Sequence, residues 1–145
     1  MTATGVQIVI DCADPDRLAD FWAAALHYRK QDPPEGFASW PEFLTAQGVT
    51  PEHFNDASAV VDPGGAGPRI FFQRVPEPKQ VKNRLHLDLN VGGGYATAPQ
   101  ERRSRIAAEV QRLVGHGASH LRDVEERGEF HAAMRDPEGN EFDIQ

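Results

Sequence analysis

The sequence predicts an α+β protein built from two similar halves, each running strand, helix and then further strands. Two observations carry this prediction. An apolar strand segment precedes an amphipathic helical segment in each half, and short strand segments divided by turns rich in glycine and proline follow both helices. A third observation is the proline-rich break at 76–79, near the middle of the chain. The 145 residues fit one domain of two modules, which we place at about 1–78 and 79–145.

The first half opens with an apolar strand predicted over 6–12. Asp14 and Pro15 then supply a helix N-cap and a proline at the first helical position. Apolar residues at helical spacing mark the face of this helix that packs on the sheet: Leu18, Phe21, Trp22, Ala25 and Leu26. A hairpin follows, with strands predicted over 57–61 and 69–75 around a turn of aspartate, proline and glycines.

The segment 32–56 joins the first helix to this hairpin. It combines four prolines with several aromatic residues, which makes it too apolar for a plain linker, and a short helix is predicted over 40–47. Long connections of this kind often form a lid or a binding loop over a site. Packing of the aromatic residues over an edge of the core is the alternative explanation.

The second half repeats the order of elements. A strand is predicted over 84–91, and after a loop of three glycines a helix is predicted over 99–114. Glycines beyond that helix end it. The remaining strands are predicted over 118–122, 129–135 and 141–145, the last one after a tight turn at 136–140.

Composition narrows the classes of function. A net charge of −7 and a pI near 5.3 argue against a nucleic-acid-binding protein, because phosphate contacts need a concentrated basic face. The sequence has no long apolar run, which predicts no membrane segment. A single cysteine, Cys12, excludes an internal disulfide. We therefore expect a cytoplasmic protein.

Three segments resemble the glyoxalase-like branch of the vicinal oxygen chelate superfamily, which includes glyoxalases, bleomycin-resistance proteins and dioxygenases. They are the helix start from Asp14 to Trp22, the strand from Arg84 to Leu89, and the turn and strand from Asp136 to Phe142. The resemblance spans nearly the whole chain. It implies two paired βαβββ modules whose eight strands form a curved mixed sheet, a cup with helices outside and the ligand inside.

The resemblance also implies a divalent metal site. Carried over position by position, the four ligands are Gln7, Gln73, His86 and Asp143, and the ion is Ni, Mn, Fe, Co or Zn. Glyoxalase-type sites usually have glutamates where this chain has Gln73 and Asp143, which argues against glyoxalase I activity. Asp143 is the only one of the four that could both bind the ion and move a proton, so it is the candidate catalytic residue.

Strand alternation points to some of the same residues without the family. On the strand predicted over 84–91, Arg84, His86 and Asp88 share one face and leucines occupy the other. Burying this ionisable stripe is costly unless it bonds to itself, a metal or a ligand. An internal network with Arg84, metal binding through His86 and direct substrate contact all satisfy that requirement. His131 is a further candidate on the same argument, although a role outside any site is the explanation that the sequence favours.

Two classes of function remain open at this stage. The first is a metal-dependent lyase, isomerase or dioxygenase that acts on a small oxygenated metabolite, with the 32–56 segment closing the site. The second is a metal-free pocket that sequesters a small organic molecule, as bleomycin-resistance proteins do. The candidate substrate-binding residues are Trp40, Phe43, Phe54, Phe72, Arg84 and Asp88. The resemblance implies a homodimer as well.

Overall fold

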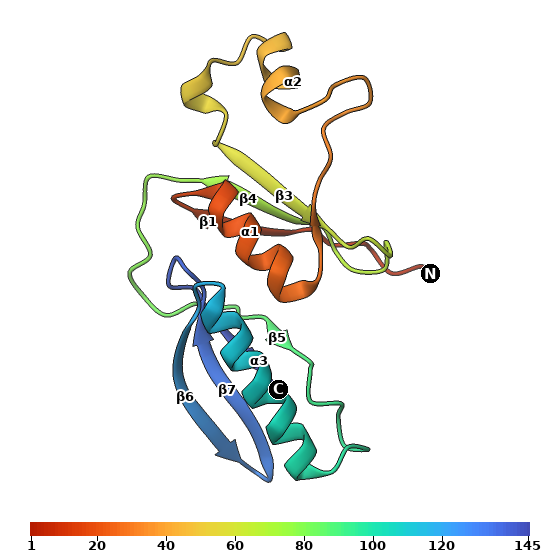
Figure 1. Cartoon of the computed structure of the whole chain (residues 1–145), viewed down its shortest axis with the longest axis vertical. Coiled ribbons are helices and arrows are strands. Elements are labelled where there is room, and N and C mark those ends of the chain that lie inside the picture. Colours follow the sequence, from red (N-terminus) through yellow and green to blue (C-terminus); the bar gives the residue numbers. More distant parts are fainter. The chain divides into compact units, whose positions relative to one another are not determined.

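The computed structural model describes residues 1–145, which form two compact units, Met1–Pro78 (unit 1) and Lys79–Gln145 (unit 2). Each unit contains one four-stranded mixed sheet and runs strand, helix and three strands (Figure 1). The predicted α+β class and the repeated βαβββ module are thus confirmed. None of the helices combines the length and the apolar character that crossing a membrane requires.

Unit 1 has its strands in the order β1-β4-β3-β2, with β1 parallel to β4 and the other pairs antiparallel. Strand β2 was not predicted, because two residues are too few to show a strand period. The other elements lie close to their predicted places. In chain order they are β1 (Ile8–Cys12), α1 (Pro15–Leu26), β2 (Arg29–Lys30), α2 (Trp40–Ala46), the 3-10 helix η1 (Pro51–His53), β3 (Ala57–Val61) and β4 (Ile70–Arg74).

The core of unit 1 lies between α1 and the sheet. The helix packs across β3 and β4 (Figure 1). It buries Leu18 and Trp22 against Ile70 and Phe72 of β4, and these four side chains are at most 2% exposed. Because side chains alternate along a strand, the neighbours of Ile70 and Phe72 point to the opposite face of the sheet. That opposite face is therefore available to form a site.

The start of α1 is fixed by Asp14, whose carboxylate accepts a hydrogen bond from the backbone N–H of Arg17. The side-chain amide of Asn55 also donates to this carboxylate, at 2.8 Å. The Asn55 amide and the Arg17 N–H together hold the pKa of Asp14 below its ordinary value of 3.8. The ionised carboxylate is thus the form that the fold stabilises.

Replacing Asp14 by alanine is expected to lower the free energy of unfolding by about 1 kcal/mol, the usual cost of losing an N-cap. Since the folded pKa lies below the unfolded one, the carboxylate's contribution is fully present above about pH 4 and is lost as the pH falls through the folded pKa. Urea unfolding followed between pH 2 and 7 checks this. An Asp14→Asn variant keeps a capping side chain that does not titrate, so its stability should fall less steeply below pH 4 than that of the natural protein; an equal slope contradicts the assignment.

The segment that carries α2 and η1 projects beyond the end of β3 (Figure 1) and is tied to the rest of unit 1 at both ends. At one end the indole N–H of Trp40 donates to the backbone oxygen of Gln31 at 2.7 Å. At the other end the side-chain oxygen of Asn55 accepts from the backbone N–H of Asp16 at 2.9 Å. These contacts attach the segment to the residue after β2 and to the first turn of α1.

Unit 2 has the strand order β5-β8-β7-β6, with β5 parallel to β8 and the other pairs antiparallel. Helix α3 packs on one face of this sheet (Figure 1). Ile106, Val110 and Leu113 form its buried face. The elements are β5 (Asp88–Leu89), α3 (Pro99–Gly115), β6 (Ser119–Glu126), β7 (Glu129–Arg135) and β8 (Glu141–Ile144).

Two strands of unit 2 differ from their predicted extents. Strand β5 is far shorter than the predicted 84–91, because it pairs with β8 only at two positions and Leu85 is 88% exposed instead of packed. Strand β6 is longer than predicted and forms a hairpin with β7. Its two-residue turn has Arg127 and Gly128 at positive φ, the geometry that suits the twist of a hairpin. The charged residues before this turn do not show the apolar alternation by which a strand is predicted, so the predicted strand ended too early.

The turn before β8 is held by Asp136, the one buried charged residue of the protein at 3% exposure. One of its carboxylate oxygens accepts from the backbone N–H groups of Glu138 and Asn140, and the other accepts from the Asn140 side chain. These bonds satisfy a carboxylate that would be costly to bury alone. They also fix the direction in which β8 leaves the turn.

Candidate metal centre and ligand cavities

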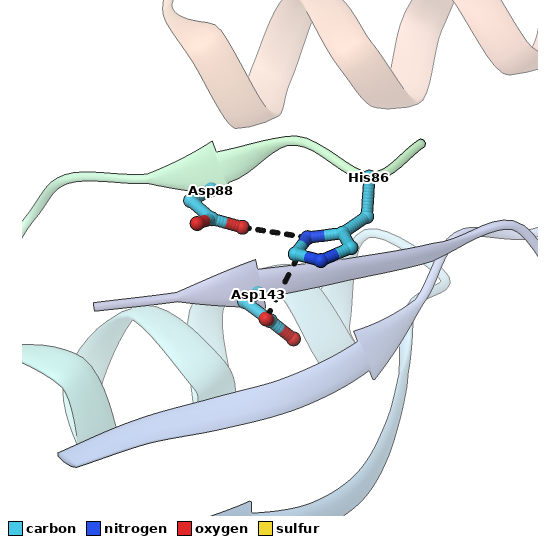
Figure 2. A group of neighbouring side chains, drawn as sticks. All are labelled: His86, Asp88 and Asp143. Carbon is cyan, nitrogen blue, oxygen red and sulfur yellow. Dashed lines mark hydrogen bonds and ion pairs between the residues drawn. The ribbon is translucent and has the colours of Figure 1, made fainter. Parts of the chain in front are cut away.

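His86, Asp88 and Asp143 come together on one face of the unit 2 sheet. Asp88 and Asp143 are directly paired across the parallel strands β5 and β8. His86 lies two residues before Asp88 and so shares its face. Figure 2 shows the three side chains turned toward one another. Two adjacent strands therefore position this cluster.

The distances within the cluster suit a metal ion. One ligand atom from each of the three residues lies within 4.8 Å of the other two. The His86 Nδ1 is 2.8 Å from Asp88 Oδ1 and 3.7 Å from Asp143 Oδ2 (Figure 2). All three side chains keep contact with solvent, from 22% exposure for Asp143 to 41% for His86. Divalent transition metals accept an imidazole and a carboxylate as donors, and a second carboxylate beside them can serve either as a further ligand or to orient the imidazole.

His131 on β7 faces the same cluster. Its Nε2 lies 3.8 Å from Asp143 Oδ2, the same oxygen that lies 3.7 Å from His86 Nδ1. Ala133 pairs with Asp143 and lies two residues after His131, which puts both on this face of the sheet. From the sequence, His131 is a candidate but not a committed site residue. Alternation along β7 was the signal for it, and that signal alone does not separate a site residue from a surface one.

A polar cavity of about 490 Å³ in unit 2 adjoins the cluster. Asp143, His86 and His131 line it, and so do four basic side chains: Lys79, Lys82, Arg122 and Arg135. Its acidic wall includes Glu141. Burial works against ionisation of Glu141, but the backbone N–H of Asn83 and the Lys79 ammonium outweigh it and lower the pKa of this carboxyl. The cavity thus combines the candidate ligands with groups able to bind an anion.

Arg84 does not join the cluster. It is exposed, it lies outside the cavity lining, and no ion pair connects it to His86 or Asp88. The internal network with Arg84 that the sequence allowed is therefore absent. Asp88 contacts His86 but is not part of the cavity lining either.

The other two residues that the resemblance implies as ligands belong to unit 1. Gln73 is exposed on β4, where it pairs with Asp11. Gln7 precedes β1, and its side-chain oxygen accepts a hydrogen bond from Nη1 of Arg69 at 2.7 Å. The structure thus brings His86 and Asp143 together within unit 2, and it engages Gln7 with an arginine in unit 1.

Unit 1 has its own cavity of about 850 Å³, which we call the lid cavity. Its walls come from the segment with α2 and η1, and its floor from β3 and β4. Two of the candidate substrate-binding residues, Trp40 and Phe54, line this cavity, whereas Phe43 lies outside its lining and packs edge-on against Trp40. Phe72 is fully buried in the core, and its neighbour Phe71 lines the cavity instead. The α1 side of the sheet takes Phe72 because the packed helix needs a large apolar partner there.

Comparison with known proteins agrees with the architecture. Solved structures with a similar fold include a variant of the fosfomycin resistance protein FosX from Listeria monocytogenes, complexed with Mn(II) and 1S,2S-dihydroxypropylphosphonic acid (TM-score 0.63, 11% identity, 100% of this chain and 90% of that chain). Another is a glyoxalase/bleomycin resistance protein/dioxygenase family enzyme from Burkholderia phytofirmans (TM-score 0.60, 15% identity, 95% and 94% of the two chains).

A third is the bleomycin-binding protein from Streptomyces verticillus complexed with copper(II)-bleomycin (TM-score 0.52, 17% identity, 100% and 97% of the two chains). At these identities the likeness concerns the fold. A search of curated proteins found no match. A family model described as a glyoxalase-like domain, however, matches residues 7–145. The chain therefore belongs to the glyoxalase-like domain family.

Proposed function

We propose that this protein is a divalent-metal-dependent enzyme that acts on a small oxygenated metabolite by lyase, isomerase or dioxygenase chemistry. The observation that carries the proposal is the cluster of His86, Asp88 and Asp143 at the edge of a polar cavity. Structural metal sites are usually closed by protein ligands, whereas catalytic ones keep positions open. A partly exposed cluster with few ligands fits the second description.

Each residue of the cluster has a role in this proposal. Asp88 engages Nδ1 of His86, which leaves Nε2 as the nitrogen that binds the ion, and carboxylates commonly orient metal-binding histidines in this way. Asp143 supplies an anionic ligand and moves the substrate proton, with His131 beside it. Gln7 and Gln73 are the neutral ligands that the family implies, and Gln7 would have to release the guanidinium of Arg69 in order to bind an ion through its side-chain oxygen. When bound, the metal would act as a Lewis acid toward two neighbouring substrate oxygens.

The charges of the cavity favour a substrate that carries an anionic group. Glu141 faces Lys79 at 3.3 Å and Arg135 at 4.0 Å, and its single negative charge offsets only one of these two positive charges. Lys82 and Arg122 form no ion pair and line the same space. A bound divalent ion would add further positive charge. An anionic oxygenated metabolite matches this environment better than a neutral one.

The second candidate function is metal-free binding of a small organic molecule. The lid cavity favours it, because aromatic and aliphatic side chains line a space within the size range of small-molecule sites. One structural neighbour is described as a bleomycin-binding protein, which is a function of this second kind. The homodimer that the family resemblance implies stays a prediction.

Metal content separates the two candidates. In protein purified without an affinity tag, mass spectrometry is expected to find close to one divalent metal ion per chain. Dialysis against a chelator should remove that ion, and calorimetry should show it binding again. Absence of metal, together with no binding of Mn, Fe, Co, Ni or Zn above the level of an Asp143→Ala variant, would rule out the metal-dependent enzyme and leave the second candidate.

A further inference from the structure

The lid cavity contains a cation that has no acidic partner. Arg69, immediately before β4, lines the cavity, and its guanidinium makes two hydrogen bonds, from Nε to the side-chain oxygen of Gln31 and from Nη1 to that of Gln7. Both bonds are 2.7 Å long, and both acceptors are neutral amides. Two amide oxygens orient the guanidinium but cancel none of its charge.

The other ionic groups of the cavity are paired. Lys30 binds the carboxylates of Asp16 and Asp20 at 2.5 and 2.8 Å. His53 is 2.8 Å from Asp56. The guanidinium of Arg69, in contrast, lies 5.2 Å from the ring centre of Phe71, on the cavity floor, and forms no ion pair. Arg69 is therefore the one basic side chain of this cavity whose charge is left for a ligand.

The cavity around Arg69 is built for an apolar body. The segment with α2 and η1, which we call the lid segment, contributes Trp40, Leu44, Val49 and Phe54. The sheet contributes Ala57, Ala59 and Phe71. The alanines leave room above the sheet that larger side chains would fill. The hydrogen bond from the Trp40 indole to the Gln31 backbone fixes one wall to the same residue that orients Arg69. Walls and cation are thus held in place before any ligand arrives, which lowers the entropic cost of binding.

We propose that the lid cavity binds a small organic carboxylate with an apolar or aromatic body, whose carboxylate pairs with Arg69. A guanidinium carries five N–H donors in a plane, and two of those of Arg69 are in use, so the rest can meet the two oxygens of a carboxylate. The apolar body lies among the aromatic side chains of the lid. This inference concerns unit 1 alone and holds whether or not unit 2 binds a metal.

The test uses three probes and the full chain in the presence of a chelator, so that metal binding makes no contribution. The probes are naphthalene-2-carboxylate, its neutral analogue naphthalene-2-carboxamide, and acetate, which has the charge without the body. Calorimetry should show the naphthoate binding about tenfold or more tightly than the amide, because the charged pair replaces a neutral hydrogen bond. Acetate should bind far more weakly than either. Fluorescence of Trp40 should change on addition of the naphthoate.

Variants locate the binding group. An Arg69→Gln variant is expected to lose the preference for the naphthoate over the amide, and Arg69→Lys should keep part of it. The matched control is Arg17→Gln, which removes the same charge from an exposed position of α1 outside the cavity and should change neither affinity. Equal affinities for naphthoate and amide in the natural protein would overturn the proposal without reliance on any variant. So would a preference that survives Arg69→Gln in protein whose circular dichroism shows an unchanged fold.

Discussion

Replacing Asp143 by alanine is expected to weaken divalent-metal binding by about 100-fold or more while leaving the fold intact. The reason is that Oδ2 of Asp143 lies 3.7 Å from Nδ1 of His86 and 3.8 Å from Nε2 of His131, so this carboxylate approaches both rings. Loss of groups that merely orient a metal ligand typically costs 10- to 100-fold in affinity, so loss of a ligand should cost at least the upper figure. Calorimetric titration with Mn, Co, Ni and Zn measures it.

The same unit offers a matched control in Asp123. Its carboxylate is 2.8 Å from Nε2 of His120, so it belongs to an exposed histidine–aspartate pair outside the cluster. Asp123→Ala should bind metal as the natural protein does. The metal affinity of Asp88→Asn should lie between those of Asp143→Ala and Asp123→Ala, because this change disturbs the orientation of His86 without removing a ligand. If the three variants bind alike, the cluster is not the metal site.

Replacing Phe72 by alanine is expected to lower the free energy of unfolding of unit 1 by about 3–5 kcal/mol, whereas Phe71→Ala should cost about 1–2 kcal/mol. Phe72 is fully buried against α1, so its removal leaves a cavity that the packed core fills only in part. Phe71 is only half-buried and lies on the floor of the lid cavity. Phe72 therefore stabilises the core on one face of β4, whereas Phe71 lines the cavity on the other face.

Tryptophan fluorescence during urea unfolding measures both effects, because Trp22 and Trp40 are the only tryptophans and both belong to unit 1. The Phe71→Ala variant should in addition weaken binding of the naphthoate probe. Similar losses of stability in the two variants would contradict the assignment of the two faces of β4.

Several elements were predictable because their signals are local. The N-cap at Asp14, the proline after it and the apolar spacing of α1 lie within one short segment. Strand β5 was overestimated for the opposite reason. Its alternation of leucines with polar residues continues back to Arg84, but whether a residue pairs depends on β8, which offers only four residues.

In the candidate sites, too, some features follow from local sequence patterns and others depend on how strands pair. Alternation correctly put His86 and Asp88 on one face, and it allowed His131, but their distances to Asp143 depend on strand register, which no local pattern encodes. The choice between Phe71 and Phe72 depends on which face of β4 the helix covers. Arg69 carried no sequence signal, because the evidence for it is the neutral character of its partners, Gln7 and Gln31.

The lid segment is attached to the rest of unit 1 at both of its ends, so the chain between the two attachment points can vary among proteins of this fold. The chain leaves the sheet beside Gln31, where the Trp40 indole is anchored, and it returns at Asn55, which holds the first turn of α1. Because the entropic cost of closing a loop grows only with the logarithm of its length, the stretch between these anchors can be shortened, extended or exchanged at small cost to stability. Exchange of this stretch would therefore change the apolar walls of the cavity while Arg69 and the sheet stay in place.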